Sequence, residues 1–251
     1  MSNSSLVTYT QISPNTYGKR GVPTKITIHH MAVVNASLQA IGNSFAKKSR
    51  KACSNYGIDS KGNVALYLGE DYAPITSSSK ANDMVAVTIE VSNCKGAPNW
   101  EVSDAAYNKL IDLCVDICKR NNIAKLNFTG DKNGNLTYHS MFAATACPGP
   151  YLKARMKEIA DTVNEKLANN TAPAAKPTTT QTAKPVSSTT KEYKVRVTAN
   201  VLNIRKGPGT SYPVVGSIRD KGVYTIVDSK SGWGKLKSGA GWIYLNYTKK
   251  I

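Results

Sequence analysis

The sequence VPTKITIHH, residues 22–30, decides the fold of the larger part of this chain. Its residues 25–29 are rich in β-branched side chains and predict a strand that ends in histidine. Two further strands are predicted at 64–68 and 85–91. Apolar residues recur at helical spacing in three segments, 35–51, 104–120 and 150–167. Strands and helices in turn predict an α/β fold, with layers of both around one core.

The chain changes character after residue 168. Residues 169–191 are rich in Thr, Ala, Pro and Ser, with Val186 as the single large aliphatic residue. Such a segment cannot bury enough apolar area to offset chain entropy, so we expect a flexible linker. Residues 192–251 contain short strand-like runs separated by glycine-containing turns, which predict a small all-β barrel. The expected organisation is a domain at 1–168, the linker, and a domain at 192–251.

The net charge is concentrated near the C-terminal end. The whole chain carries +17, and residues 169–251 alone contain 14 basic against 3 acidic side chains. This excess predicts an anionic partner: nucleic acid, a membrane surface or an anionic wall polymer, with a merely soluble basic surface as the alternative. The sequence contains no run of about 18 apolar residues, so no membrane span is predicted. The first residues lack the features of a secretory signal, so we expect a product of the cytoplasm.

Histidine is scarce, and its placement is therefore informative. The chain has three histidines and five cysteines. His29 ends the first strand, and His139 precedes Cys147 by eight residues. Two histidines and one thiolate, with water in the fourth position, form a common catalytic zinc arrangement. The spacing alone leaves a metal site and ordinary polar or core roles both open. Cys114 and Cys118, in contrast, lie on an apolar helical stripe and are expected in the core, with a metal-binding pair as the alternative.

Four segments resemble the zinc-dependent N-acetylmuramoyl-L-alanine amidases of phage endolysins and the peptidoglycan-recognition proteins. In chain order they are VPTKITIHH at 22–30, SNYGIDSKG at 54–62, VTIEVSN at 87–93, and YH at 138–139 followed by ACPG at 146–149. The resemblance implies the amidase fold, with a mixed central sheet flanked by helices. It also implies one zinc ion per chain and peptidoglycan as substrate.

The resemblance also implies a set of metal ligands. His29, His139 and Cys147 stand where the family has its three zinc ligands. Successive side chains of a strand point to opposite faces, so His29 and His30 are not expected to share one metal. Periodicity does not choose between the two, and the choice of His29 rests on the resemblance alone. His30 is expected to be a packed, hydrogen-bonded neighbour, with a catalytic role as the alternative.

Two further residues are implied in catalysis. Glu90 stands where similar endolysins place a glutamate that activates the zinc water, with a surface-facing Glu90 at the sheet edge as the alternative. Thr145 stands where some members have a lysine, and its hydroxyl is expected to hydrogen-bond the developing oxyanion less strongly than an ammonium would. Ser54 replaces a tyrosine that other members place near the metal, so it cannot fill that role.

The tail resembles the bacterial SH3-like domains of wall hydrolases. The similar segments are LNIRKGPGTSY at 202–212, GWGK at 232–235 and GWIYL at 241–245. Trp233 and Trp242 are expected mainly in the barrel core. Tyr212, in the long loop, is the better candidate for contact with the wall.

These observations predict a peptidoglycan hydrolase, a phage endolysin that cleaves the amide between N-acetylmuramic acid and L-alanine and causes cell lysis. It would reach the wall after membrane permeabilisation, and its basic tail would bind an anionic wall polymer. One alternative is a non-catalytic peptidoglycan-binding protein, which the presence of Cys147 disfavours. The other is a nucleic-acid-binding protein, which is disfavoured because the tail's tryptophans follow turn glycines and form no stacking platform.

Overall fold

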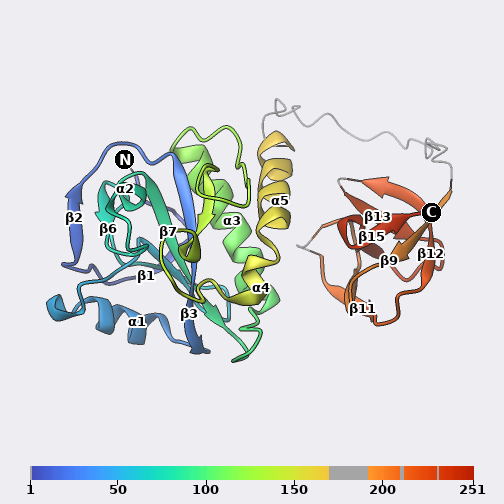
Figure 1. Ribbon diagram of the computed structural model, residues 1–251, viewed down its shortest axis with the longest axis horizontal. Helices are drawn as coiled ribbons and strands as arrows, with labels where there is room; N and C mark the ends of the chain where they lie inside the picture. Colours follow the sequence, from blue (N-terminus) through green and yellow to red (C-terminus); the bar gives the residue numbers. More distant parts are fainter. Residues whose placement is uncertain (1, 170–191, 210–211, 231) are drawn as a thin grey trace, which may run out of the picture. The chain divides into compact units, whose positions relative to one another are not determined.

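The computed structural model describes residues 2–169, 192–209, 212–230 and 232–251 (Figure 1). The chain separates into two compact units, Met1–Ala172 and Pro173–Ile251. The expected linker at 169–191 lies outside the described residues except for Asn169, the last residue of a helix. No helix among the described residues is long and apolar enough to cross a membrane.

The larger unit is built on a six-stranded mixed sheet with the order β1-β5-β4-β7-β3-β8. The strands are β1 Val7–Thr10, β3 Lys25–Val34, β4 Tyr56–Ile58, β5 Val64–Leu66, β7 Ala86–Asn93 and β8 Leu136–Tyr138. Neighbouring strands are parallel except for the antiparallel pair β4 and β5. A separate ribbon pairs β2, Thr16–Lys19, with β6, Tyr72–Pro74. The expected mixed α/β sheet is confirmed.

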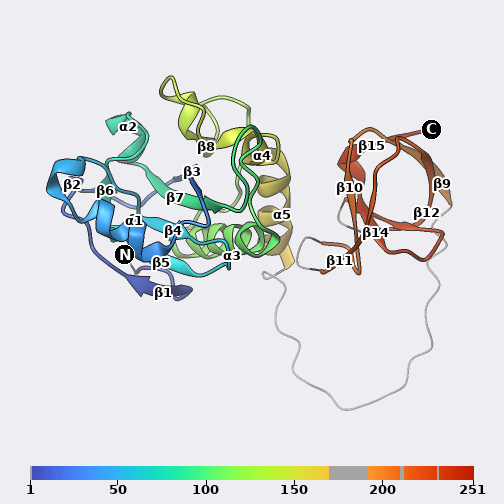
Figure 2. The ribbon, with the colours of Figure 1, turned by 90° about the horizontal axis from the view of Figure 1, so that it is seen from below.

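Helices cover both faces of this sheet. Figure 2 shows α3, Asp104–Arg120, and α5, Met156–Asn169, together on one face, with α2, Lys80–Asp83, on the other. The remaining helical segments are α1 Leu38–Phe45, η1 Lys48–Arg50, η2 His139–Met141 and α4 Gly149–Lys153. Ser103 caps α3 by accepting the N–H of Ala106 at 3.2 Å. Cys114 and Cys118 are fully buried in the core, as expected.

The helix expected after Pro150 is interrupted. α4 ends at Lys153 and α5 starts at Met156, because the N–H of Arg155 bonds the carbonyl of Leu152, three residues back, instead of continuing the α-helical pattern. The apolar face still runs through both pieces: Leu152, Met156, Ile159 and Val163 are all buried. The apolar face thus stays buried against the sheet, although the helix is interrupted.

The smaller unit is a seven-stranded antiparallel sheet with the order β11-β10-β14-β13-β12-β9-β15. Its strands are β9 Tyr193–Val197, β10 Leu202–Arg205, β11 Val214–Ile218, β12 Val223–Lys230, β13 Trp233–Leu236, β14 Trp242–Tyr244 and β15 Thr248–Lys250, with η3 at Leu245–Tyr247. Trp233 is buried in this all-β unit, whereas Trp242 is half-buried.

Candidate metal centre

The two faces of the parallel strands have different chemistry, and strand register determines it. Residues paired across parallel strands point to the same face. The paired residues Ile26, Val87 and Leu136 are fully buried in the core that contains α3 and α5. The next row, Thr27, Thr88 and Thr137, faces the other side. This second face, which we call the polar face, therefore has hydroxyl groups where the first has aliphatic groups.

Two strands present chemically active side chains together on the polar face. His29 of β3 is paired with Glu90 of β7. Ile28 is paired with Tyr138 of β8, so His139 follows Tyr138 at the level of His29. The row above the threonines is thus His139, His29 and Glu90. His30, one residue further along β3, belongs to the opposite face because side chains alternate.

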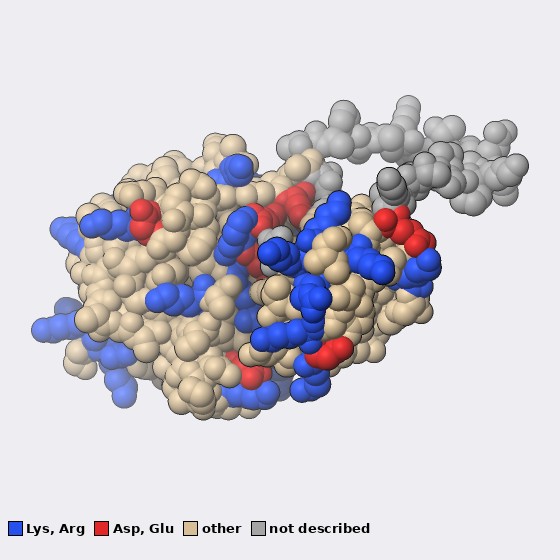
Figure 3. Space-filling view, turned by 45° about the vertical axis from the view of Figure 1, so that its right-hand side comes forward, with Lys and Arg blue, Asp and Glu red and all other residues tan. Residues whose placement is uncertain are grey.

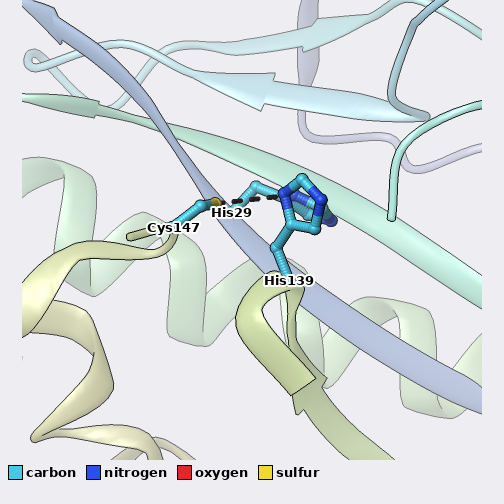
Figure 4. Close-up of side chains that lie close together, drawn as sticks. All are labelled: His29, His139 and Cys147. Carbon is cyan, nitrogen blue, oxygen red and sulfur yellow. Dashed lines mark hydrogen bonds between the residues drawn. The ribbon is translucent and has the colours of Figure 1, made fainter. Parts of the chain in front are cut away.

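Cys147 completes a cluster with the two histidines. One ligand atom from each of His29, His139 and Cys147 lies within 4.8 Å of the others (Figure 4). His29 Nδ1 is 3.6 Å from Cys147 Sγ, and the two histidine rings have centroids 4.7 Å apart. The structure brings together the three residues that the resemblance implied. Nitrogen, nitrogen and sulfur form a donor set suited to a transition metal.

The loop after β8 is held so that Cys147 faces the histidines. Its Sγ accepts the backbone N–H of His30 at 3.4 Å, and its own N–H donates to Thr145 Oγ1 at 3.2 Å. The N–H of Ser140 donates to the carbonyl of Cys147 at 3.0 Å. Three hydrogen bonds thus fix a residue that belongs to no strand. Backbone N–H donors of this kind also stabilise a thiolate.

Burial sets the protonation of the cluster. It lowers the pKa of His29 well below the usual value, with further lowering by His139 and His30, and it also lowers the pKa of His139. Burial raises the pKa of the Cys147 thiol well above its usual range, and Glu90 raises it further. The histidines are therefore neutral at pH 7 and the thiol keeps its proton when no cation is bound. A neutral imidazole can bind a metal ion through its free lone pair without first losing a proton.

The cluster also contains ring nitrogens without partners. Nε2 of His29 and Nε2 of His139 are buried and form no hydrogen bond with the described residues. A buried polar atom without a partner costs about 1–3 kcal/mol. A metal ion bound through His29 Nδ1, the atom near Cys147, would leave His29 Nε2 pointing away from the ion, so that nitrogen needs a partner of its own, such as a water molecule or substrate.

The side chain of Glu90 has little contact with solvent, and one of its carboxylate oxygens lacks a hydrogen-bond partner in the described part of the chain. Its Oε2 is buried without a hydrogen-bond partner among the described residues. Burial raises its pKa to about 8, and Arg50 acts in the opposite direction. On the far side, Glu90 is paired with Gly57, where a Cβ would lie 2.6 Å from Tyr67 Cε2. Gly57 therefore leaves room for the Tyr67 ring beside the carboxylate. Because β7 lies between β4 and β3 inside the sheet, Glu90 is not at a sheet edge.

Arg50 and Tyr67 were not singled out by the sequence. Arg50 belongs to η1, and its charge lowers the pKa of Glu90. Tyr67 is fully buried, and its hydroxyl donates to the carbonyl of Leu38 at 2.7 Å. The run of basic residues at 47–51 was the available signal for Arg50. Tyr67 had none, because its place beside Glu90 depends on the pairing of β4 with β7.

The other expected site residues are not members of the three-residue cluster, although Thr145 and His30 each form a hydrogen bond with Cys147. Thr145 is exposed, and its oxygen accepts the Cys147 N–H described above. Ser54 is buried and donates its hydroxyl to the carbonyl of Tyr56 at 2.8 Å. His30 is buried with its ring edge against Trp100, at a centroid distance of 5.4 Å, as expected of a packed neighbour, but its Nδ1 has no hydrogen-bond partner among the described residues. Tyr212 belongs to the smaller unit and is 44% exposed.

Comparison with known families accounts for both units. Residues 19–150 match the family of N-acetylmuramoyl-L-alanine amidases, and residues 200–249 match the bacterial SH3 domain. A curated relative, the putative N-acetylmuramoyl-L-alanine amidase YrvJ of Bacillus subtilis (strain 168), is 40% identical over 48 residues, which are 18% of this chain. The match covers only 9% of that relative.

Several solved structures are similar in fold. PlyL has a TM-score of 0.49 and 14% identity, with coverage of 65% of this chain and 97% of that one. The Ph2119 endolysin from Thermus scotoductus MAT2119 bacteriophage Ph2119 has a TM-score of 0.42 and 18% identity, with coverage of 58% and 89%. Drosophila peptidoglycan recognition protein SA has a TM-score of 0.45 and 16% identity, with coverage of 59% and 90%.

Proposed function

Because the chain belongs to the N-acetylmuramoyl-L-alanine amidase family, we propose that it hydrolyses peptidoglycan at the amide between N-acetylmuramic acid and L-alanine. The observation that carries the proposal is the cluster of His29, His139 and Cys147 beside Glu90 on one face of the sheet. A metal-binding donor set next to an unpartnered carboxylate is what metal-assisted hydrolysis needs.

Zinc is the metal that fits the cluster. Tetrahedral zinc has bonds of about 2.05 Å to nitrogen and about 2.3 Å to sulfur, which place two such ligands about 3.6 Å apart. His29 Nδ1 and Cys147 Sγ are 3.6 Å apart. Three protein ligands, with a fourth position left for water or substrate, is the pattern of catalytic zinc sites. We propose one zinc ion per chain, held by His29, His139 and Cys147.

The residues around the cluster would divide the work of hydrolysis. When bound, zinc would polarise the scissile carbonyl and make a water molecule more acidic. Glu90 would take the proton from the attacking water and pass it to the leaving amine of L-alanine. The hydroxyl of Thr145 would donate to the developing oxyanion, since its oxygen already accepts the Cys147 N–H and its proton is available.

The smaller unit would keep the enzyme at its substrate. It matches the bacterial SH3 domain and carries no histidine or cysteine, so its contribution would be binding to the wall, with Tyr212 as a contact. We propose that the protein is an endolysin that acts on the wall after membrane permeabilisation and lyses the cell. Tethering raises the local concentration of the catalytic unit without any new contact at the zinc site.

Product analysis tests the reaction. Purified cell walls are digested with the zinc-loaded protein, and the products are examined by mass spectrometry. We expect free L-alanine amino groups and intact muramic acid without new reducing ends. New reducing sugars would indicate a glycosidase, and no release of either product by a folded, zinc-loaded protein would favour a binding protein instead.

A further inference from the structure

Three basic side chains lie together on the outer surface of the smaller unit. Arg196 of β9 is directly opposite Lys249 of β15, and Lys194 is two residues from Arg196 along the same strand. Val195 and Val197, the residues that alternate with them, are 2% and 1% exposed. Alternation therefore turns Lys194, Arg196 and Lys249 outward together. We call these three residues the basic face.

The arrangement is unfavourable for the sheet itself. Like charges placed directly opposite each other on antiparallel strands destabilise the pair. The side chains of Arg196 and Lys249 are both exposed, and neither forms an ion pair with a described residue. Repulsion between them is therefore relieved only by solvent and salt. A binding role would explain why the cost is retained.

The acidic side chains of this unit do not neutralise the basic face. Residues 192–251 contain only three, against eleven basic side chains. Glu192 forms an ion pair with Lys237 at 2.7 Å. Asp220 accepts the Tyr224 hydroxyl at 2.6 Å, and Asp228 lies opposite Lys235. Figure 3 shows the same imbalance, with many basic and few acidic side chains on the visible surface of the smaller unit.

We propose that the basic face binds a phosphodiester-linked anionic polymer of the bacterial wall, an inference that rests on the proposed wall-directed function. The backbone positions of residues two apart on one strand are about 6.6 Å apart, and those of residues opposite each other on adjacent strands are about 4.8 Å apart. A rigid sheet thus presents three cations to neighbouring phosphates of one chain. The guanidinium of Arg196 can bind a phosphate through two hydrogen bonds.

The neighbouring side chains favour a polyol phosphate over a nucleic acid. Val223 is paired with Arg196, and Thr225 with Lys194, so aliphatic and hydroxyl groups continue the face into β12. The ring of Tyr193 alternates to the other side and has the Lys250 ammonium 4.5 Å from its centroid. Among the described residues, no aromatic side chain of β9, β12 or β15 points outward with the basic face. Binding of single-stranded nucleic acid relies on such aromatic platforms.

A charge-matched pair of variants of the full chain tests the proposal. The face variant is Lys194→Gln/Arg196→Gln/Lys249→Gln, and the control is Lys206→Gln/Arg219→Gln/Lys230→Gln, three exposed basic residues outside the basic face. The probe is purified poly(glycerol phosphate), titrated at several salt concentrations. We expect the face variant to bind at least about 10-fold more weakly and to lose about 2 to 3 units of slope in log K against log salt. The control should change less than about 3-fold.

A second variant separates lost binding from lost folding. Lys249→Glu creates an attractive cross-strand pair with Arg196, so the melting temperature of the smaller unit should rise while polymer binding falls. A variant that is more stable yet binds more weakly cannot be explained by unfolding. Unchanged binding by Lys249→Glu would overturn the proposal.

Further comparisons identify the ligand of the basic face. A separate activity measurement tests the proposed function independently of binding. Equal losses in the face variant and its control would show that only net charge matters, which overturns the basic face as a site. Tighter binding of a single-stranded oligonucleotide than of poly(glycerol phosphate) would also overturn it. Amide cleavage of a soluble muramyl-peptide by the parent chain is measured separately. Its absence would count against the proposed hydrolase and would leave the binding result to be judged alone.

Discussion

The two units of this protein differ in the kinds of functional side chain that they contain. The larger unit contains every histidine and cysteine of the chain and places three of them with Glu90 on one face of a sheet. The smaller unit contains none of these residue types but has eleven basic side chains against three acidic ones in residues 192–251. Chemistry requires groups at fixed mutual distances, whereas retention on a polyanion requires charge. Their separation predicts that each can be removed without the other.

The largest expected effect is loss of the metal. Cys147→Ser replaces the thiolate with a weaker ligand and should reduce zinc from about one per chain to near zero, with activity falling more than about 100-fold. Zinc is measured by elemental analysis of the purified protein. Cys94→Ser, at a half-buried free cysteine outside the cluster, is the control and should keep the parent's zinc content and activity. Full zinc content in Cys147→Ser would remove this residue from the ligand set.

Glu90→Gln should separate chemistry from metal retention. The amide is nearly isosteric but cannot accept a proton, and loss of a general base costs about 100- to 10,000-fold in kcat. Zinc content and melting temperature should remain those of the parent. Glu101→Gln, at a carboxylate paired with Lys95 at 2.8 Å, is the matched control. Near-parent cleavage by Glu90→Gln would assign proton transfer to another group.

Removing the smaller unit should have a substrate-dependent effect. Residues 1–172 include the complete cluster and its own buried core. This fragment should cleave a soluble muramyl-peptide at close to the full-length rate but should act more slowly on intact walls. Rates are compared at increasing salt, where the difference should narrow as charge-based tethering weakens. A folded, zinc-loaded fragment that is inactive on the soluble substrate would place part of the active site in the smaller unit.

The smallest effect concerns protons. Burial keeps the Cys147 thiol protonated and both histidines neutral at pH 7, and it raises the pKa of Glu90 to about 8, so zinc binding to the parent chain can also release the Glu90 proton. In Glu90→Gln, which lacks that carboxyl, zinc binding should release about one proton, from Cys147 alone. The apparent zinc affinity of this variant should therefore rise about tenfold for each unit of pH increase near neutrality. Calorimetry in buffers of different ionisation enthalpy counts the protons. Release of two or more by this variant would show that a histidine is charged in the metal-free protein.

Several features of the site could be predicted from the sequence. Three histidines in the chain, one at a strand end and another eight residues before a cysteine, made a metal site one of two open interpretations. The resemblance of four segments to a known family selected His29 over His30. The α/β layers and the burial of Cys114 and Cys118 followed from local periodicity, because apolar spacing is a property of neighbouring residues along the chain.

Other features depended on contacts between distant segments. The pairing of His29 with Glu90, and of Gly57 with Glu90, is a matter of register among β3, β7 and β4. The approach of Arg50 to Glu90 depends on where the chain returns after α1. The break between α4 and α5 left the apolar pattern unchanged, so no local signal marked it.

The sequence by itself determined which chemical groups the protein has, the order in which they occur, and the character of its two units. Only the tertiary structure decided which of these groups meet: Cys147 with the two histidines in one unit, and Arg196 with Lys249 in the other. The physical reason is range. Periodicity and turn chemistry act over a few residues, whereas strand register is fixed by burying one complete apolar face, and that burial also sets which polar side chains lie together on the opposite face.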